Sequence, residues 1–186
     1  MRLIDKDFVY EKYGLRARLV QENDAEFIYK LRSNATKSKY IHDIKGGVEN
    51  QVEWIRNYKQ REEEGTDYYF IYYRGDVPVG LNRIYSIHEK TYTGGSWVMD
   101  DEATMEEVIA CPIMMREIAF EVVGMEVEDD YDACHVDNKK VIRYNKMSGM
   151  KIYKHFQDVK GEYVAMSMTK EDFERNKPKM LNMIGY

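Results

Sequence analysis

The order of apolar patterns along this chain of 186 residues predicts an α/β (α+β) fold, with one mixed, mostly antiparallel central sheet and helices on both of its faces. Two stretches near the amino end, 22–34 and 49–63, carry apolar residues at helical spacing. Several strand-like runs follow one another between residues 69 and 99, as in an antiparallel meander. A strand at 132–136 between two helical stretches calls for a parallel crossover, so the sheet is expected to be mixed.

The first elements have clear local signals. Residues 14–20 alternate apolar and basic side chains, with Leu15, Ala17 and Leu19 on one face, as in a half-buried strand. The helix at 22–34 has acidic residues in its first turn, where the helix dipole favours them. The next helix, at 49–63, has an apolar stripe and is followed by a glycine that ends it.

Glycine pairs and turns organise the middle of the chain. A Gly-Asp pair at 75–76 joins strands 69–74 and 77–87 into a hairpin. The strand at 92–99 contains two glycines, at 94–95, which suggest a bulge or a close backbone approach. The remaining elements are an apolar helix at 113–123, the strand at 132–136, a helix at 138–147, strands at 151–157 and 162–168, and a polar tail at 169–186 that forms a short surface helix. No linker divides the chain, so residues 1–186 are expected to form a single domain.

Composition excludes several classes of function. Lys and Arg number 28 against 33 Asp and Glu, which leaves a formal charge of −5 and no basic footprint for nucleic acid. No apolar run approaches the roughly 18 residues of a membrane span, and no secretory signal is visible, so we expect a soluble, cytoplasmic protein. The two cysteines, Cys111 and Cys134, are interpreted as small buried hydrophobes. The four histidines are scattered singly, so no metal site is expected.

The segment DNKKVIRYNKMSGM, from residue 137 to 150, carries the most specific motif. Asn138, Val141, Gly149 and Met150 match the strand-to-helix passage of the Gcn5-related N-acetyltransferase superfamily, which the chain resembles over about 14–168. The likeness is closest to a bacterial branch of polysaccharide and amino-sugar acetyltransferases grouped with ribosomal-protein acetylating relatives. That branch shows patterns similar to SKY at 38–40, QVEWIRNY at 51–58, DYYF at 67–70 and GSWVM at 95–99.

The resemblance implies acetyl-CoA as co-substrate. In this fold the fourth strand, here 92–99, splays from the fifth, here 132–136, and the free backbone groups take the pantetheine arm like an added strand. Backbone N–H groups ahead of the third helix bind the pyrophosphate. The loop at 100–107 departs from the pattern, because it has no glycine and carries five carboxylates, while Pro112 fits a first helical turn. The implied cofactor-binding residues are Trp97, Val98, Met99, Met105, Val108, Ile109, Asn138, Val141 and Lys146.

The resemblance also implies direct acetyl transfer without a covalent enzyme intermediate. A backbone N–H near Val98 or Met99 is the implied oxyanion donor. The family's acid is often a tyrosine seven positions after the motif asparagine, where this chain has Asn145, with Tyr144 one position earlier and turned by roughly 100° on a helix. Asn145 is alternatively a capping or surface residue. His135 is either a core histidine or a general base; His88 and Glu89 are interpreted as surface residues.

The acceptor is expected near Tyr40, His42, Asn82, Arg83 and Tyr85. The predicted function is N-acetyl transfer to a primary amine of a small acceptor, with an amino sugar or nucleotide-linked amino sugar favoured by the branch likeness. A non-catalytic acyl-CoA-binding or protein-interaction module stays open, as does a protein that associates through the methionines of its third helix, although core packing is the simpler interpretation of those methionines. A homodimer is a separate expectation. The tyrosines at 68, 69, 72 and 73 are interpreted as strand packing.

Overall fold

The computed structural model describes residues 2–37, 39–41, 44 and 46–186. Its centre is an eight-stranded sheet with the order β1-β2-β3-β4-β5-β6-β8-β7. The strands are β1 (Val9–Lys12), β2 (Leu15–Leu19), β3 (Tyr68–Arg74), β4 (Val77–His88), β5 (Thr91–Met99), β6 (Val127–His135), β7 (Lys151–Asp158) and β8 (Gly161–Thr169). The helical elements are η1 (Glu22–Asp24), α1 (Ala25–Ser33), α2 (Val48–Glu63), α3 (Met105–Glu117), the π-helical η2 (Ile118–Val123), α4 (Lys139–Ser148) and α5 (Lys170–Asn182).

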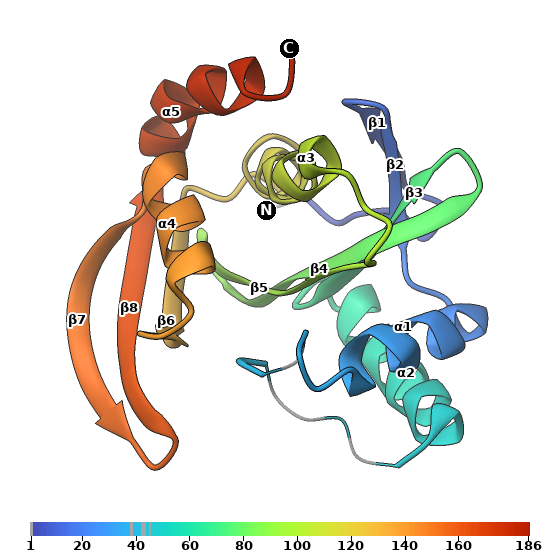
Figure 1. Cartoon of the computed structure of the whole chain (residues 1–186). Coiled ribbons are helices and arrows are strands. Elements are labelled where there is room, and N and C mark those ends of the chain that lie inside the picture. Colours follow the sequence, from blue (N-terminus) through green and yellow to red (C-terminus); the bar gives the residue numbers. More distant parts are fainter. Residues whose placement is uncertain (1, 38, 42–43, 45) are drawn as a thin grey trace.

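Helices cover both faces of the sheet, as Figure 1 shows. The α1 and α2 pair lies on one face of β3 to β5, and α3 lies on the other, while α4 and α5 stand beside β6 and β8. All strand pairs are antiparallel except β5 with β6, which is parallel. The predicted mixed, mostly antiparallel sheet with helices on both faces is therefore confirmed.

Two apolar cores lie on opposite faces of the sheet, and β3 contributes to both. Tyr68, Phe70 and Tyr72 pack in the core that includes α3 and α5, whereas Tyr69 and Ile71 pack in the core beneath α1 and α2. Successive residues of a strand point to opposite faces, so a strand covered on both sides is apolar throughout. The tyrosines at 68, 69 and 72 are fully buried, which confirms their interpretation as strand packing.

Four elements differ from the predictions. The structure adds β1, an exposed edge strand whose side chains lack the alternation that marks a half-buried strand. Strand β6 begins at Val127, five residues before the predicted start at 132. Helix α5 is not only a surface helix, because Phe173 and Met180 are buried in the core.

Helix α3 begins at Met105, not at residue 113, so Pro112 lies in the helix interior and not in its first turn. Thr104 caps the helix: its hydroxyl accepts the Glu107 N–H, and the Glu107 carboxylate accepts the Thr104 N–H. This capping box, T-x-x-E, is visible in the sequence and identifies the start. Two of the five carboxylates expected in a loop, Glu106 and Glu107, thus belong to the helix.

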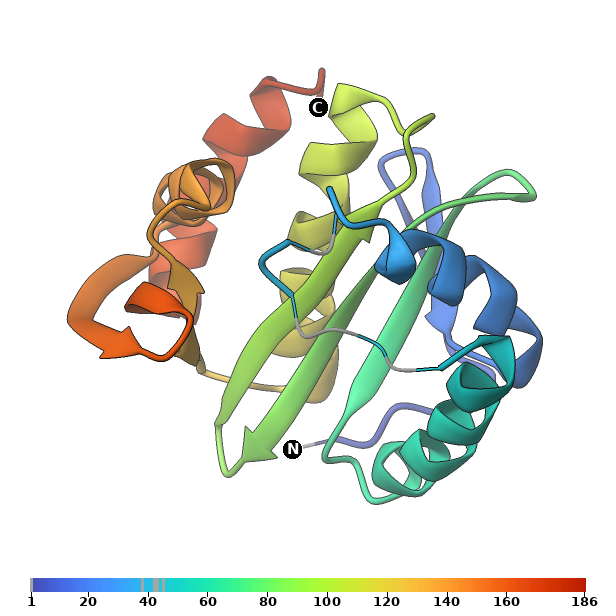
Figure 2. The same cartoon turned by 60° about the horizontal axis from the view of Figure 1, so that its bottom comes forward.

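The parallel contact between β5 and β6 is short and then opens. Only Thr91 with Val127 and Tyr92 with Glu128 are paired, and beyond them the strands diverge toward their carboxyl ends. Figure 2 shows the resulting gap between the strands of the meander and the β6–β8 group. The predicted splayed pair is confirmed. In the part of the chain that the structure describes, no helix combines the length and apolar character that a membrane crossing requires.

Candidate active site

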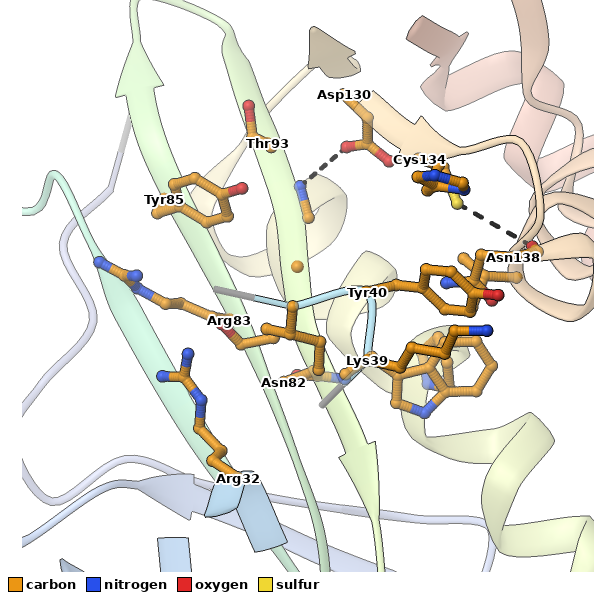
Figure 3. Close-up of a pocket in the computed structure, with 18 of the residues that line it drawn as sticks. Arg32, Lys39, Tyr40, Asn82, Arg83, Tyr85, Thr93, Asp130, Cys134 and Asn138 are labelled. Carbon is orange, nitrogen blue, oxygen red and sulfur yellow. Dashed lines mark hydrogen bonds between the residues drawn. The ribbon is translucent and has the colours of Figure 1, made fainter. Parts of the chain in front are cut away.

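A cavity of about 1090 Å³ occupies the opening between β5 and β6. Its walls come from α1 and the segment after it, α2, β4, β5, α3, β6, α4 and the β7–β8 hairpin. In Figure 3, Arg32, Arg83 and Tyr85 lie on one side of the hollow, and Asp130 and Asn138 lie on the other. The cavity is therefore the place where distant segments of sequence meet.

The cavity brings together much of the predicted site. It is lined by Trp97, Asn138, Val141, Asn145 and His135 from the expected cofactor and catalytic sets, and by Tyr40, Asn82, Arg83 and Tyr85 from the expected acceptor set. Its lining does not include Val98, Met99, Met105, Val108, Ile109, Lys146 or Tyr144. His42 lies outside the described residues. The roles assigned to all of these residues stay predictions.

Strand β5 carries a bulge in the wall of the cavity. Ser96 and Trp97 together face the single residue Asn82 of β4, because the register shifts there. Ser96 takes a φ of 52°, a left-handed conformation that is uncommon for a residue other than glycine. The irregular backbone thus ends just before Val98, the first of the two predicted oxyanion positions.

The two glycines before the bulge mark a close approach of side chains. A Cβ at Gly94 would stand 2.7 Å from Glu128 Oε1, and one at Gly95 would stand 2.9 Å from the ring of Tyr85. The sequence predicted either a bulge or a close approach at this glycine pair. The structure has the close approach at the two glycines and the bulge directly after them.

Side chains extend the contact between β5 and β6 beyond their paired backbones. The Gly94 N–H donates to Asp130 Oδ1 at 3.1 Å, and Thr93 Oγ1 donates to the Asp129 carbonyl at 2.8 Å. These bonds close the narrow end of the gap. Past Gly94, the facing backbone edges of the two strands are separate.

Two acidic residues of β6 lie at this narrow end in different electrostatic states. Glu128 is buried and accepts Arg116 Nε at 2.7 Å, Arg116 Nη2 at 3.0 Å and the Tyr92 hydroxyl at 2.8 Å. Asp130 has no ion pair among the described residues. Burial, followed by the negative charge of Glu128, raises the pKa of Asp130 well above its usual range, against the opposing charge of Arg116. A buried carboxyl of raised pKa in a cavity is a common feature of sites for acid–base chemistry.

Neither acidic residue was predicted as part of the site. The sequence signal that could have identified them is VEDD at 127–130, because Glu128 and Asp130 are two residues apart and so share one face of a strand. That face could not be assigned to the cavity while the strand was expected to begin at 132.

Arg116 holds the cavity side of α3 to β6 and α4. Besides Glu128, its Nη2 donates to Asn145 Oδ1 at 3.0 Å, and its guanidinium lies 5.6 Å from the centre of the Tyr144 ring. Burial alone would lower the pKa of Arg116, but the adjacent Glu128 charge raises it, so the group stays cationic. Its side chain is 2% exposed, and its Nη1 has no hydrogen-bond partner among the described residues.

The two α4 residues of the predicted catalytic set, Tyr144 and Asn145, are both bonded to other parts of the protein. The Tyr144 hydroxyl donates to the Ile109 carbonyl at 2.9 Å, its ring packs 4.8 Å from that of Trp97, and burial raises the pKa of Tyr144. Asn145 is buried, and its carbonyl oxygen accepts from Arg116, so it is neither a surface residue nor a helix cap.

His135 and Asn138 lie at the rim. His135 is half-buried between the rings of Tyr40 and Tyr163, at 5.3 and 5.1 Å, and its Nδ1 accepts the Asp137 N–H at 3.1 Å. His135 is thus not a fully buried core histidine, and its role as a general base stays a prediction. Asn138 occupies the N-cap position of α4, yet its side chain makes no capping bond and lines the cavity instead.

The acidic turn before α3 is largely neutralised. Asp100 pairs with Lys30 at 3.2 Å, and Asp101 pairs with Lys37 at 2.9 Å. Glu107 pairs with Arg74 at 3.0 Å. These cations come from α1, from the segment that follows it and from β3, so the compensation is not visible in the local sequence.

The predicted acceptor residues Asn82 and Arg83 both have structural partners. Asn82 accepts the Tyr72 hydroxyl at 2.9 Å and donates to the Cys111 carbonyl at 3.2 Å, which joins β4 to α3. Arg83 forms a two-pronged ion pair with the buried Asp67. Their cavity-facing surfaces are thus held rigidly.

Cys111 and the methionines of α3 match their simpler interpretations, whereas Cys134 is not the buried hydrophobe that was predicted. Cys111 is fully buried; Cys134 is half-buried at the cavity, and burial followed by the charge of Asp130 raises its pKa to about 12. A thiol with so high a pKa is a poor nucleophile at neutral pH. Met114 and Met115 are buried in the core. Among the described residues, no cluster of three His, Cys, Asp or Glu side chains has metal-binding geometry.

Comparisons with known proteins find similarity at the level of structure. No protein-family model matches the sequence, and no curated protein sequence matches it. The apo structure of FdhC, a nucleotide-linked sugar GNAT, matches with 32% identity and a TM-score of 0.82 over 96% of this chain and 99% of FdhC. Spermidine N-acetyltransferase from Vibrio cholerae, solved with CoA and spermine, matches at 13% identity and a TM-score of 0.76, over 88% and 99% of the two chains. Ribosomal-protein-S5-alanine acetyltransferase from Vibrio fischeri matches at 12% identity and a TM-score of 0.74, over 90% and 99%.

Proposed function

The chain belongs to the Gcn5-related N-acetyltransferase superfamily of acyltransferases, and we propose that it moves an acetyl group from acetyl-CoA to the primary amine of a nucleotide-linked amino sugar. The observation that carries the proposal is the opening between β5 and β6, with the raised-pKa carboxyl of Asp130 at its narrow end. An amine acceptor needs a base at the point where the thioester reacts, and Asp130 supplies one there.

The residues around the opening fit the pantetheine arm of acetyl-CoA. Separated strand edges have backbone donors and acceptors for an extended chain of amides. Two further donors in the cavity wall, Trp97 Nε1 and Arg116 Nη1, are buried and have no hydrogen-bond partner among the described residues. Buried donors are rarely left unpaired, so both are matched to oxygen or sulfur atoms of a ligand.

The wall formed by α2 and β4 suits a nucleotide-linked sugar. Trp54 and Tyr85 present aromatic surface to the cavity on either side of Arg83, whose guanidinium lies 5.2 Å and 4.8 Å from the two ring centres. Gln51 is 4% exposed, lines the same wall, and its Nε2 has no hydrogen-bond partner among the described residues. Aromatic faces stack on sugar and base rings, and buried amides select hydroxyl and carbonyl groups.

The size of the cavity and the similarity to FdhC support this acceptor class. At about 1090 Å³ the cavity is at the upper end of ligand pockets, which span roughly 300–1,000 Å³. FdhC, at 32% identity, is a nucleotide-linked sugar GNAT, whereas the spermidine enzyme is 13% identical. A cavity with room for both a pantetheine arm and a second large molecule fits the first acceptor better than a slender polyamine.

The chain's own residues support direct transfer of the acetyl group to the amine, without a covalent enzyme intermediate. Asp130, ionised above its raised pKa, takes the proton from the ammonium or from the attacking amine. Its Oδ1 bond to the Gly94 N–H fixes the carboxyl at the gap. Cys134 is protonated at neutral pH, which argues against a covalent intermediate at this residue.

The first test is thermal unfolding with and without acetyl-CoA. A ligand present at 100 times its dissociation constant adds about 2.7 kcal/mol, which corresponds to a rise of roughly 5–10 °C for a domain of this size. The acceptor is then sought by following thiol release with nucleotide-linked amino sugars, spermidine and an alanine-terminated peptide. Release with the nucleotide sugars alone is the expected result. Affinity for CoA without turnover on any amine would favour the non-catalytic acyl-CoA-binding module.

A further inference from the structure

If the pantetheine arm of acetyl-CoA binds between β5 and β6, its thioester must lie at the closed end of the gap. The backbones of the two strands are paired up to Tyr92 and Glu128. Two residues further along each strand, the Asp130 side chain accepts a hydrogen bond from the Gly94 N–H. An extended chain that enters from the open side cannot pass this bridge. The atoms that react are therefore beside Gly94 and Asp130, because the base must reach them.

Arg116 borders the same closed end. It is bound to Glu128, two residues before Asp130 on β6, through Nε and Nη2. Its Nη2 also holds Asn145, so both nitrogens are used. Arg116 is one of the residues that line the cavity, and its Nη1 is buried without a partner among the described residues. A buried guanidinium N–H in this state is prepared for an acceptor that arrives with the ligand.

Neither α4 residue beside Arg116 can protonate a departing thiolate. The Tyr144 hydroxyl is bonded to the Ile109 carbonyl and its oxygen is not part of the cavity lining, and Asn145 has no acidic proton. The Tyr92 hydroxyl donates to Glu128. None of these three side chains can protonate the sulfur as the C–S bond breaks, so another group must stabilise its negative charge until a proton reaches it.

We infer that Arg116 is a catalytic residue that receives the CoA thiolate through its Nη1–H, in place of a hydroxyl acid. This inference rests on the proposed function. The amine nitrogen forms the C–N bond, the C–S bond breaks, and its electron pair stays on sulfur, which pairs with the guanidinium. The amine proton goes to Asp130 and passes to the sulfur before CoA leaves as the thiol. Glu128 and Asn145 hold the guanidinium in position.

The test is an ultraviolet titration of the thiol of CoA bound to the protein, because the thiolate absorbs and the thiol does not. With wild-type protein, the thiol pKa is expected to lie about 1–3 units below that of free CoA, as an opposite charge in contact produces. Arg116→Lys keeps the positive charge but loses the rigidly placed N–H donors of the guanidinium. This variant is expected to bring the pKa of the bound thiol back toward that of free CoA. Arg83→Lys, a matched change to another ion-paired arginine of the cavity, is expected to leave it unchanged.

Glu128→Gln gives a shift of the opposite sign. It keeps one of the two acceptor oxygens that Arg116 uses but removes the neutralising charge, so the bound thiol is expected to titrate at a still lower pH than in the wild type. General damage to the fold would not move the two variants in opposite directions. This second variant also keeps the inference testable if Arg116→Lys fails to fold.

Two results would overturn the inference. The first is CoA that binds to the wild type with a thiol pKa equal to that of free CoA. The second is a lowered thiol pKa that neither Arg116→Lys nor Glu128→Gln changes. A wild-type protein that binds no CoA at all would overturn the proposed function itself, and this inference with it.

Discussion

The Gly94 N–H donates to Asp130 Oδ1 at 3.1 Å, across the gap at the point where the backbones of β5 and β6 cease to pair. One side chain thus does two things. It satisfies a backbone donor that the diverging strands would leave unpaired. It also holds a carboxyl of raised pKa beside the place where an amine and a thioester would meet.

Replacing Asp130 by Asn separates its chemical role from its structural one. Asn keeps an oxygen for the Gly94 N–H but cannot take a proton, so kcat should fall by about 10²–10⁴. The raised pKa means that Asp130 favours folding at low pH and that this contribution is lost as pH rises through that pKa. Calorimetry should therefore give a higher Tm for the variant than for the wild type at pH 8, and the difference in Tm should be smaller near pH 4. An active variant, or one less stable at pH 8, would contradict the assignment.

Glu128→Gln should move the acidic limb of the pH–rate profile to lower pH. The groups that face Asp130 are Glu128 and Asp129 on its own strand, Arg116 on α3 and Cys134 further along β6. Removing the negative charge of Glu128 lowers the pKa of Asp130, so the base is ionised at a lower pH. The measurement is kcat/KM of thiol release against pH. Asp129→Asn is the control: Asp129 has the weaker influence on Asp130, and the limb should move much less.

Alanine at the two glycines of β5 should have different effects. At Gly94 the added Cβ would meet Glu128 Oε1 at 2.7 Å and displace the Arg116–Glu128 pair, so kcat and Tm should both fall. At Gly95 it would meet the Tyr85 ring at 2.9 Å, on the acceptor wall, so KM for the acceptor should rise more than kcat falls. Steady-state kinetics of the two variants distinguishes these outcomes; equal effects on kcat would count against the separate roles of the two walls.

The lysines beside the acidic turn should support CoA affinity. Lys37 donates to the Met99 carbonyl and pairs with Asp101, each at 2.9 Å. Lys37→Gln leaves Asp101 unpaired and should weaken acetyl-CoA binding, whereas Asp101→Asn should strengthen it slightly. Titration calorimetry at low and high salt measures both effects. They should shrink at 1 M salt, where screening acts over about 3 Å; salt-independent differences would mean that charge is not their cause.

Glu117 stabilises the side of α3 away from the cavity. It is fully buried and accepts from Lys12, Lys177, Tyr10 and Tyr13, which ties the β1–β2 hairpin and α5 to α3. Burial alone would raise its pKa, but these donors outweigh it and lower the pKa, so the stabilisation is present above the unfolded pKa and is lost as pH falls through the folded one.

Glu117→Gln should therefore cost about 3 kcal/mol at pH 7 in denaturant unfolding, with kcat unchanged at a temperature where the variant is folded. Glu121→Gln removes only a half-exposed partner of Lys177 and should cost under about 1 kcal/mol. Equal losses for the two variants would contradict this explanation.

Local patterns were sufficient for most of the architecture. The hairpin at 75–76 within the meander and the crossover through 132–136 predicted the mixed sheet, and the family resemblance carried by the motif from Asn138 to Met150 implied the opening beside 92–99. The start of α3 was missed although its capping box, Thr104 to Glu107, is written in the sequence. Strand β1 could not be predicted in this way, because an exposed edge strand carries no burial period.

The sequence by itself determined which segments are helices and strands, because burial on one face imposes a repeat of 3.6 or 2 residues that is readable locally. It also pointed to Asn138, Val141 and Asn145 as residues of one site, and the cavity contains all three. Only the tertiary structure decided the electrostatics: that Arg116 pairs with Glu128 and not Asp130, that Asn145 holds the guanidinium, and that lysines neutralise the acidic turn. Charge interactions depend on distance through space and on burial, and neither can be read from spacing along the chain.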